Sequence, residues 1–301
     1  MPDVTLLALA GTTQGVFGAG VVTAFEEGNL YPRIRNAFGV SAGSMNLGYF
    51  LAQQSRLGSS IYFDDLSTRK FIRPIYVPIG IVGRFIHRYI KSIPLKCRVK
   101  PVDIDYAFEF VTKHKTLNVS HMEKALKRIE FKILLGDPIN ATVSYVDARG
   151  ETFAKLKAAI ALIPYYNRAI EVGGEPRIDG GLIDAMAIKD VLSSIPEDDT
   201  LIVISNFSFE RRIRHYIKDA IEAWVASLMF RGSLARVMRH RIENLRKNLE
   251  ILNCRKNLIV LQPDPEYAVK PSTISRVKLI RLYAHGIEKG KDALKKLQHR
   301  V

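Results

Sequence analysis

The stretch from Thr5 to Phe25 contains no charged residue, and this limits the folds open to the chain. As a single helix it would be long enough to span a membrane. Glycines and threonines interrupt it, however, and no basic residue precedes it, which argues against a signal peptide or a membrane anchor. We therefore expect a buried strand at residues 4–10, a glycine loop at 11–15 and a buried helix at 16–27 that ends near Gly28.

A Gly-x-Ser-x-Gly pattern follows, with Ser41 between Gly39 and Gly43. Residues 37–40 suit a short strand, and residues 42–54 have the apolar spacing of a helix. This context is typical of a nucleophile elbow, in which a serine lies in a sharp turn between a strand and a helix whose backbones pass closely. An ordinary glycine-rich turn has the same pattern, so the motif alone leaves both interpretations open. With the first strand and helix, this second pair predicts a βαβ unit.

The rest of the chain continues this alternation. Further strands are expected at residues 132–136, 141–146, 201–205 and 258–261, and helices at 153–163, where Pro164 ends the helix, at 213–228, at 234–252 and at 287–301. No internal repeat or long linker divides the sequence. We therefore expect a single domain over residues 1–301, with a motif-bearing core at 4–206 and a basic, largely helical part at 207–301.

The net charge of +15 is concentrated toward the end of the chain. From Ser205 onward there are 21 Lys and Arg against 9 Asp and Glu, a balance of +12. Such a field attracts nucleic acid or anionic lipid headgroups. Because no RNA-binding motif, zinc spacing or aromatic–basic repeat is present, we expect an anionic membrane surface and no nucleic acid as partner. The isolated Cys97 and Cys254 fit reduced thiols, so the expected location is the cytoplasm, peripheral to a membrane.

Residues 66–102 contain nine Lys and Arg and no Asp or Glu, interleaved with apolar residues. Arg84, Arg88 and Lys91 share one face of a helix, and apolar residues share another. A basic amphipathic helix of this kind lies on a membrane surface. It can equally pack its apolar face on the protein core as an ordinary surface helix does, and both interpretations stay open.

An activated serine needs a base, and the sequence offers two kinds. The late histidines His215, His240 and His285 lie in charged helical sequence, so we expect them at the surface. Asp179 instead follows a short strand and precedes two glycines, which would hold its carboxylate in a tight loop. That pattern makes Asp179 a candidate base for a Ser–Asp dyad. Because Asp-Gly is also a common turn dipeptide, a plain turn stays open as the other interpretation.

Taken together, these motifs resemble the patatin-like phospholipase family. Four segments match in order: the glycine loop with its helix at 9–21, the elbow at 39–44, a small-residue helix ending in proline at 158–166, and Asp179-Gly180-Gly181. They cover about residues 4–206. Joint occurrence is much more specific than any single motif.

The resemblance implies an α/β fold of three layers, α/β/α, with a mainly parallel central sheet. It also implies hydrolysis of lipid acyl esters, of the phospholipase A or lysophospholipase type, through an acyl-enzyme. Ser41 would be the nucleophile and Asp179 the base, without a cofactor or a metal. The backbone amides of Gly11, Thr12 and Ala42 would form the oxyanion hole, and the motif glycines are Gly15, Gly39, Gly43, Gly180 and Gly181.

The glycine loop departs from the family pattern, which has three glycines, any residue, Arg or Lys, and a glycine. Here Ala10 to Gly15 reads Ala-Gly-Thr-Thr-Gln-Gly, so two glycines and the basic residue are missing. Losing one oxyanion donor would lower the rate by about 10²–10³-fold. A weak or inactive lipid-surface binding protein is therefore the alternative, and a Ser–His–Asp hydrolase is a third interpretation that the histidine contexts disfavour.

Overall fold

The computed structural model describes residues 3–73, 101–163, 165–166, 168–214, 237 and 240–298. Within them an eight-stranded sheet has the order β5-β6-β3-β2-β1-β7-β8, and β4 also pairs with β3. The strands are β1 (Val4–Ala8), β2 (Ile34–Gly39), β3 (Glu130–Asp137), β4 (Thr142–Asp147), β5 (Ile170–Val172), β6 (Glu175–Asp179), β7 (Thr200–Ile204) and β8 (Leu258–Leu261).

The middle of the sheet is parallel. β1 pairs in parallel with β2 and β7, β2 with β3, and β7 with β8, whereas β4, β5 and β6 form antiparallel pairs at one side. Every residue of β1 and β7 is buried, as expected for parallel strands covered on both faces. The apolar runs at residues 4–10 and 201–205 therefore form the sheet centre that the sequence predicts.

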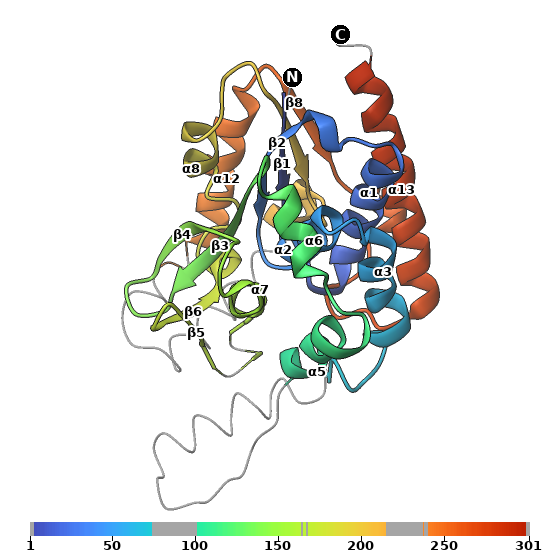
Figure 1. Cartoon of the computed structure of the whole chain (residues 1–301), viewed down its shortest axis with the longest axis vertical. Helices are drawn as coiled ribbons and strands as arrows, with labels where there is room; N and C mark the ends of the chain where they lie inside the picture. The colour runs from blue at the N-terminus through green and yellow to red at the C-terminus, as the bar shows by residue number, and fades with distance from the viewer. Residues whose placement is uncertain are drawn as a thin grey trace, which may run out of the picture.

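Helices cover both faces of this sheet (Figure 1). One face carries α1 (Val16–Glu27), α2 (Ala42–Leu51), α3 (Ser55–Ser60), α5 (Ile104–Glu109), α6 (Val119–Ala125), α7 (Thr152–Ala159) and α13 (Arg276–Gln298). The other carries α8 (Ile188–Ser193), α9 (Phe209–Arg214) and α12 (Arg241–Asn253). Short 3₁₀ turns lie at 12–15, 31–33, 180–182 and 265–267, and π-helical turns at 61–65 and 110–114. The expected three-layer α/β/α fold is confirmed.

The first and the last long helices pack directly against each other. α1 and α13 run side by side (Figure 1), and their backbones approach so closely that a Cβ on Gly20 would lie 2.2 Å from the Tyr283 carbonyl oxygen. A Cβ on Gly286 would lie 2.2 Å from the Phe17 carbonyl oxygen. Glycine is required at both positions because the partner atoms belong to a rigid helical backbone. The expected helix at 287–301 is thus the second half of α13, which begins at Arg276.

The uncharged stretch forms β1, a 3₁₀ turn and α1, and α1 ends at Glu27 before Gly28 as predicted. None of the described helices is both long and apolar enough to cross a membrane. The basic segment around Arg84, Arg88 and Lys91 lies outside the described residues, as does most of the helix expected at 213–228.

Several helix ends differ from the prediction. The helix expected at 42–54 ends at Leu51, and α12, in the stretch expected to be helical at 234–252, begins at Arg241 after the non-helical His240. The helix expected at 153–163 ends at Ala159, and Ile160 adopts φ −105° and ψ 5°. Beyond it the Ala161 carbonyl oxygen accepts a hydrogen bond from the Asp179 amide at 3.3 Å. This contact with the end of β6 fixes the chain in a turn, so a tertiary interaction ends the helix before Pro164.

Candidate active site

Ser41 lies in a strained turn between β2 and α2. Its backbone has φ 54° and ψ −124°, a conformation that non-glycine residues rarely adopt. A Cβ on Gly43 would lie 2.1 Å from the Ala8 carbonyl oxygen, which itself accepts a hydrogen bond from the Val40 amide at 2.9 Å. The helix therefore begins against the end of β1, and only glycine fits there. Strain of this kind is retained mainly at functional sites.

The sheet brings Asp179 to the same place. β2 pairs with β3 as far as Gly39, opposite Ile133, and then turns away as the elbow. Two residues further along β3, the same edge of β3 pairs with β6 instead, and Asp179 lies opposite Leu135. The end of β6 thus occupies the position that β2 has vacated, and Ser41 and Asp179 meet although 138 positions separate them in the sequence.

The Asp179 carboxylate is buried and hydrogen-bonded. Its side chain is 1% exposed, and Oδ1 accepts a bond from the Gly181 amide at 2.8 Å. Burial raises its pKa to about 6, against the lowering effects of a hydrogen bond with Ser41, the Gly181 amide and the charge of Arg241. Asp179 is therefore ionised at neutral pH and a stronger base than an exposed aspartate, as proton abstraction from a serine requires.

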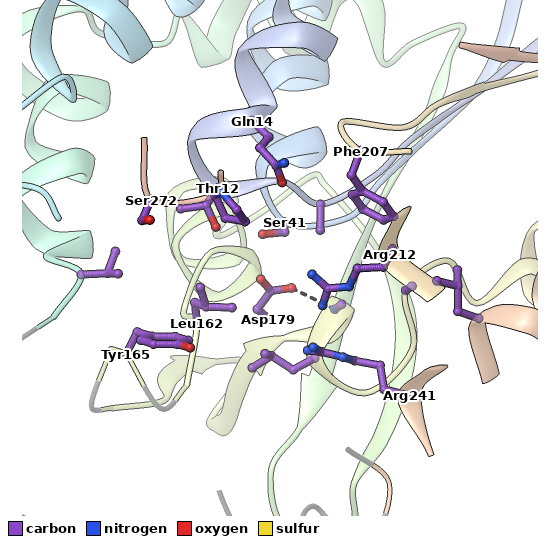
Figure 2. A pocket seen from close by; sticks show the side chains of 18 of the residues that line it. Thr12, Gln14, Ser41, Leu162, Tyr165, Asp179, Phe207, Arg212, Arg241 and Ser272 are labelled. Atoms are coloured by element: carbon purple, nitrogen blue, oxygen red, sulfur yellow. Dashed lines mark hydrogen bonds between the residues drawn. The ribbon is translucent and has the colours of Figure 1, made fainter. Parts of the chain in front are cut away.

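Two pockets meet at Ser41. The first has a volume of about 320 Å³ and opens around the dyad of Ser41 and Asp179 (Figure 2). Its polar lining includes Thr12, Gln14, Ser41, Tyr165, Asp179, Arg212, Arg241 and Ser272. The second, of about 80 Å³, is mostly apolar and is lined by residues that include Met45, Tyr49, Ile61, Leu66, Phe71, Ile104, Ala107, Val111 and Ile160. Thr12, Ser41, Val102 and Leu162 line both, so the serine stands at their junction.

The expected oxyanion residues lie beside the serine. Gly11 and Thr12 line the first pocket, and Ala42 lines the second. Thr12 and Ala42 begin a 3₁₀ turn and α2, and amides at such positions have no partner within their own helix. Thr12 has φ 49°, a left-handed conformation that is costly for a β-branched residue. The missing family glycine thus leaves backbone strain in the loop.

The other unusual residues of this loop attach it to the C-terminal part of the chain. The Gln14 side-chain amide donates to the Val269 carbonyl oxygen at 2.7 Å, and the Thr13 hydroxyl donates to the Pro271 carbonyl oxygen at 2.8 Å. Gln14 therefore does not act as an uncharged copy of the family's basic residue. It fixes the loop to the segment between β8 and α13.

Asn206, which belongs to no recognised motif, also holds the loop in place. This residue is 1% exposed, and its Oδ1 accepts a bond from the Gly18 amide at 2.8 Å. Its Nδ2 donates to the Leu9 carbonyl oxygen at 2.6 Å and reaches that of Ala10 at 3.4 Å. A short polar residue directly after a buried strand is the only sequence signal of this role.

Replacing Asn206 with Asp is expected to destabilise the protein by about 2–4 kcal/mol and to lower turnover as the loop shifts. The new carboxylate oxygen would face the Leu9 carbonyl oxygen, where Asn206 now supplies a donor. Urea unfolding and an ester hydrolysis assay measure the two effects. The same change at the exposed Asn253 is the control, and equal stability of both variants would contradict the role of Asn206.

Of the described histidines, none lines the first pocket. The side chain of His240 is 60% exposed and lies 3.3 Å from Glu243, as expected for a surface residue. The expectation was wrong for His285, which is 4% exposed and stacks on Tyr267 with ring centroids 4.0 Å apart. It is buried because it lies on the face of α13 that packs against α1. His215 is outside the described residues.

The chain is similar to one protein family and to solved structures. A family model described as patatin-like phospholipase matches residues 10–192. Among solved structures, VipD from Legionella pneumophila is 11% identical over 98% of this chain and 67% of its own, with a TM-score of 0.46. The type III effector protein ExoU is 10% identical over 98% of this chain and 53% of its own, with a TM-score of 0.37.

No curated protein matches the chain. The chain spans about two thirds of VipD and about half of ExoU. The family match includes the glycine loop, the elbow and the Asp179 motif, and it extends over more than half of the sequence. The chain therefore belongs to the patatin-like phospholipase family.

Proposed function

We propose that the protein is a serine hydrolase that cleaves acyl esters of phospholipids or lysophospholipids through Ser41 and Asp179. One observation carries the proposal. A serine on a strained elbow shares a hydrogen bond with a buried carboxylate of raised pKa, where a polar and an apolar pocket meet. Membership of a family named for phospholipases agrees with this chemistry.

In the first half-reaction the Ser41 Oγ attacks the ester carbonyl carbon while Asp179 takes the hydroxyl proton. The carbonyl oxygen becomes negatively charged and is stabilised by the amides of Gly11, Thr12 and Ala42. The intermediate then collapses, the bond from carbon to the alcohol oxygen breaks, and Asp179 gives its proton to the leaving alcohol. The acyl group remains on Ser41.

In the second half-reaction water attacks the acyl-enzyme. Asp179 takes a proton from the water, the bond between the acyl carbon and the Ser41 Oγ breaks, and the proton passes to the serine. The free acid leaves and the enzyme returns to its starting state. A single carboxylate serves both halves because a pKa of about 6 allows it to accept and release a proton near neutral pH.

The second pocket gives the reason for a lipid substrate. Its lining is mostly aliphatic and aromatic, and it begins at the serine and extends between α2 and α5. Burying each methylene of an acyl chain there contributes about 0.8 kcal/mol. The carbonyl carbon of that chain would then lie at Ser41, with the alcohol part directed into the first pocket.

A lipid-binding protein without turnover is the second candidate, because Thr12 is strained and Gln14 is engaged with Val269. Labelling with a fluorophosphonate separates the two. This reagent phosphonylates an activated serine with loss of fluoride. The wild type should be labelled and Ser41→Ala should not, and mass spectrometry should locate the adduct on Ser41.

Ser272→Ala is the matched control, because Ser272 lines the same pocket and should not affect labelling. Circular dichroism and thermal melting verify that each variant is folded. If folded wild-type protein resists the reagent, the hydrolase is rejected in favour of the binding protein. If Ser272 or another serine carries the adduct, the assignment of Ser41 is wrong.

A further inference from the structure

We infer that Arg212 and Arg241 form a subsite for the phosphate group of a glycerophospholipid, an inference that rests on the proposed function. Both side chains line the first pocket together with Ser41 and Asp179. Figure 2 shows the two arginines on the same side of Asp179, opposite Leu162 and Tyr165. They come from α9 and from the start of α12, beyond the segment that matches the family.

The charges in this pocket favour an anionic ligand. Arg241 is 6% exposed, and burial together with the charge of Arg212 lowers its pKa to about 9, so it is protonated at neutral pH. Of the residues that line the pocket, Asp179 is the acid and Arg212 and Arg241 are the bases. In such a partly dehydrated space these cations interact with an anion more strongly than they would in water.

The shape of the site fits a phosphate in particular. Guanidinium groups bind phosphate oxygens with paired hydrogen bonds, and two of them face one pocket. Arg212 is also held over the Phe207 ring, with its guanidinium carbon 5.8 Å from the ring centroid, so part of its freedom is already restricted. In a glycerophospholipid the phosphate is a few bonds from an acyl ester. An ester at Ser41 therefore brings the phosphate within the same 320 Å³.

The arginine pair also accounts for the missing basic residue of the glycine loop. Gln14 stands at that position and donates to Val269, so the loop brings no positive charge to the pocket. Arg212 and Arg241 supply positive charge to the same pocket from α9 and α12. The chain thus holds its anion-binding groups on elements that follow the family segment.

The test compares two substrates with the same chains, dihexanoyl-phosphatidylcholine and dihexanoylglycerol, which lacks the phosphate. Arg212→Gln and Arg241→Gln should each lower kcat/KM for the phospholipid about 10- to 100-fold more than for the neutral lipid, mainly through KM. Arg241→Lys, which keeps a charge, should recover part of the loss. The assays run at about pH 8, where Asp179 is ionised and Arg241 still protonated.

Arg246→Gln is the control, because Arg246 is exposed on the same helix and the change removes the same charge. It should leave the ratio of the two kcat/KM values unchanged. If Arg241→Gln lowered kcat/KM equally for both substrates, the subsite would be overturned. Arg241 would then act by stabilising the charge of Asp179 or the fold. No loss on either substrate would overturn it as well.

Calorimetry with glycerol 3-phosphate tests the subsite without turnover, so its failure and that of the hydrolase are distinguishable. Binding to the wild type and to Arg246→Gln, with weaker binding to Arg241→Gln, would support the subsite even if no ester were cleaved. No binding to the wild type would overturn it. Inorganic phosphate that binds as tightly as glycerol 3-phosphate would indicate a free-phosphate site and overturn the lipid assignment.

Discussion

Asp179→Asn is expected to abolish ester hydrolysis and, at neutral pH, to stabilise the fold. The amide cannot take the serine proton, so the rate should fall about 10⁴-fold or more. The oxygen of the new side-chain amide would still accept the hydrogen bond from Gly181, so the turn is retained. In the wild type the rate should increase as pH rises through about 6, because the base must be ionised. His240→Ala, a change at an exposed histidine, should keep its activity.

The gain in stability follows from the sign of the pKa shift. The folded pKa of Asp179 is about 6, above the ordinary value of 3.8, so the native state binds this proton more tightly than the unfolded chain does. The protonated carboxyl favours folding below about pH 4, and this contribution is lost as pH rises through 6. The ionised carboxylate therefore costs about 3 kcal/mol at neutral pH. Burial is the largest cause of this raised pKa, and it outweighs the lowering effect of the positive charge of Arg241.

Thermal melting at two pH values tests this account. Asp179→Asn should melt at a higher temperature than the wild type at about pH 7.5, and the difference should disappear near pH 4, where Asp179 is protonated. Asp198→Asn, a change at an exposed carboxylate, should show no such pattern. A variant with reduced stability at both pH values would show that the carboxylate holds the fold together.

Gly43→Ala is expected to destabilise the protein by about 3 kcal/mol or more, with loss of activity. The added methyl group would lie 2.1 Å from the Ala8 carbonyl oxygen. This oxygen belongs to β1, which is held between β2 and β7 and cannot move away without breaking its pairing. Either α2 is displaced or the sheet opens, and both change the position of Ser41.

Gly48→Ala in the same helix is the matched control. The nearest atom to its new Cβ would be a Leu117 methyl carbon at 3.6 Å, an ordinary contact. Alanine also favours a helix over glycine by up to about 1 kcal/mol, so this variant should be as stable as the wild type or more so. Urea unfolding of the two variants measures the difference. If Gly43→Ala unfolds at the same urea concentration as Gly48→Ala, the elbow is more adaptable than its geometry indicates.

The sequence predicted features that depend on nearby residues. The buried strands are continuous apolar runs, α1 ends before a glycine, and the segment that contains Ser41 has a strand before it and a helix after it. That Ser41 and Asp179 lie close together followed only from the family resemblance, since the register of β6 on β3 determines their approach and no local pattern records it.

Other parts of the site could not be predicted, because distant residues create them. Asn206 acts through carbonyls of residues 9 and 10, and the Thr13 and Gln14 side chains find their acceptors more than 250 positions away. Arg212 and Arg241 belong to a charge-rich sequence in which nothing distinguishes a pocket residue from a surface one. His285 was misjudged for the same reason, because its charged neighbours lie on the exposed faces of α13.

The close packing of α1 on α13 has a consequence for how the chain is made. Synthesis proceeds at about 5–20 residues per second, so about 13–53 s separate the emergence of Gly20 from that of Gly286. During this time the βαβ unit that carries the serine lacks the helix that covers one side of α1. Contacts between such distant residues slow folding, because a long loop must close before they form. The nucleophile elbow is thus synthesised early but packed late, because α13 has to form before the layer around it is complete.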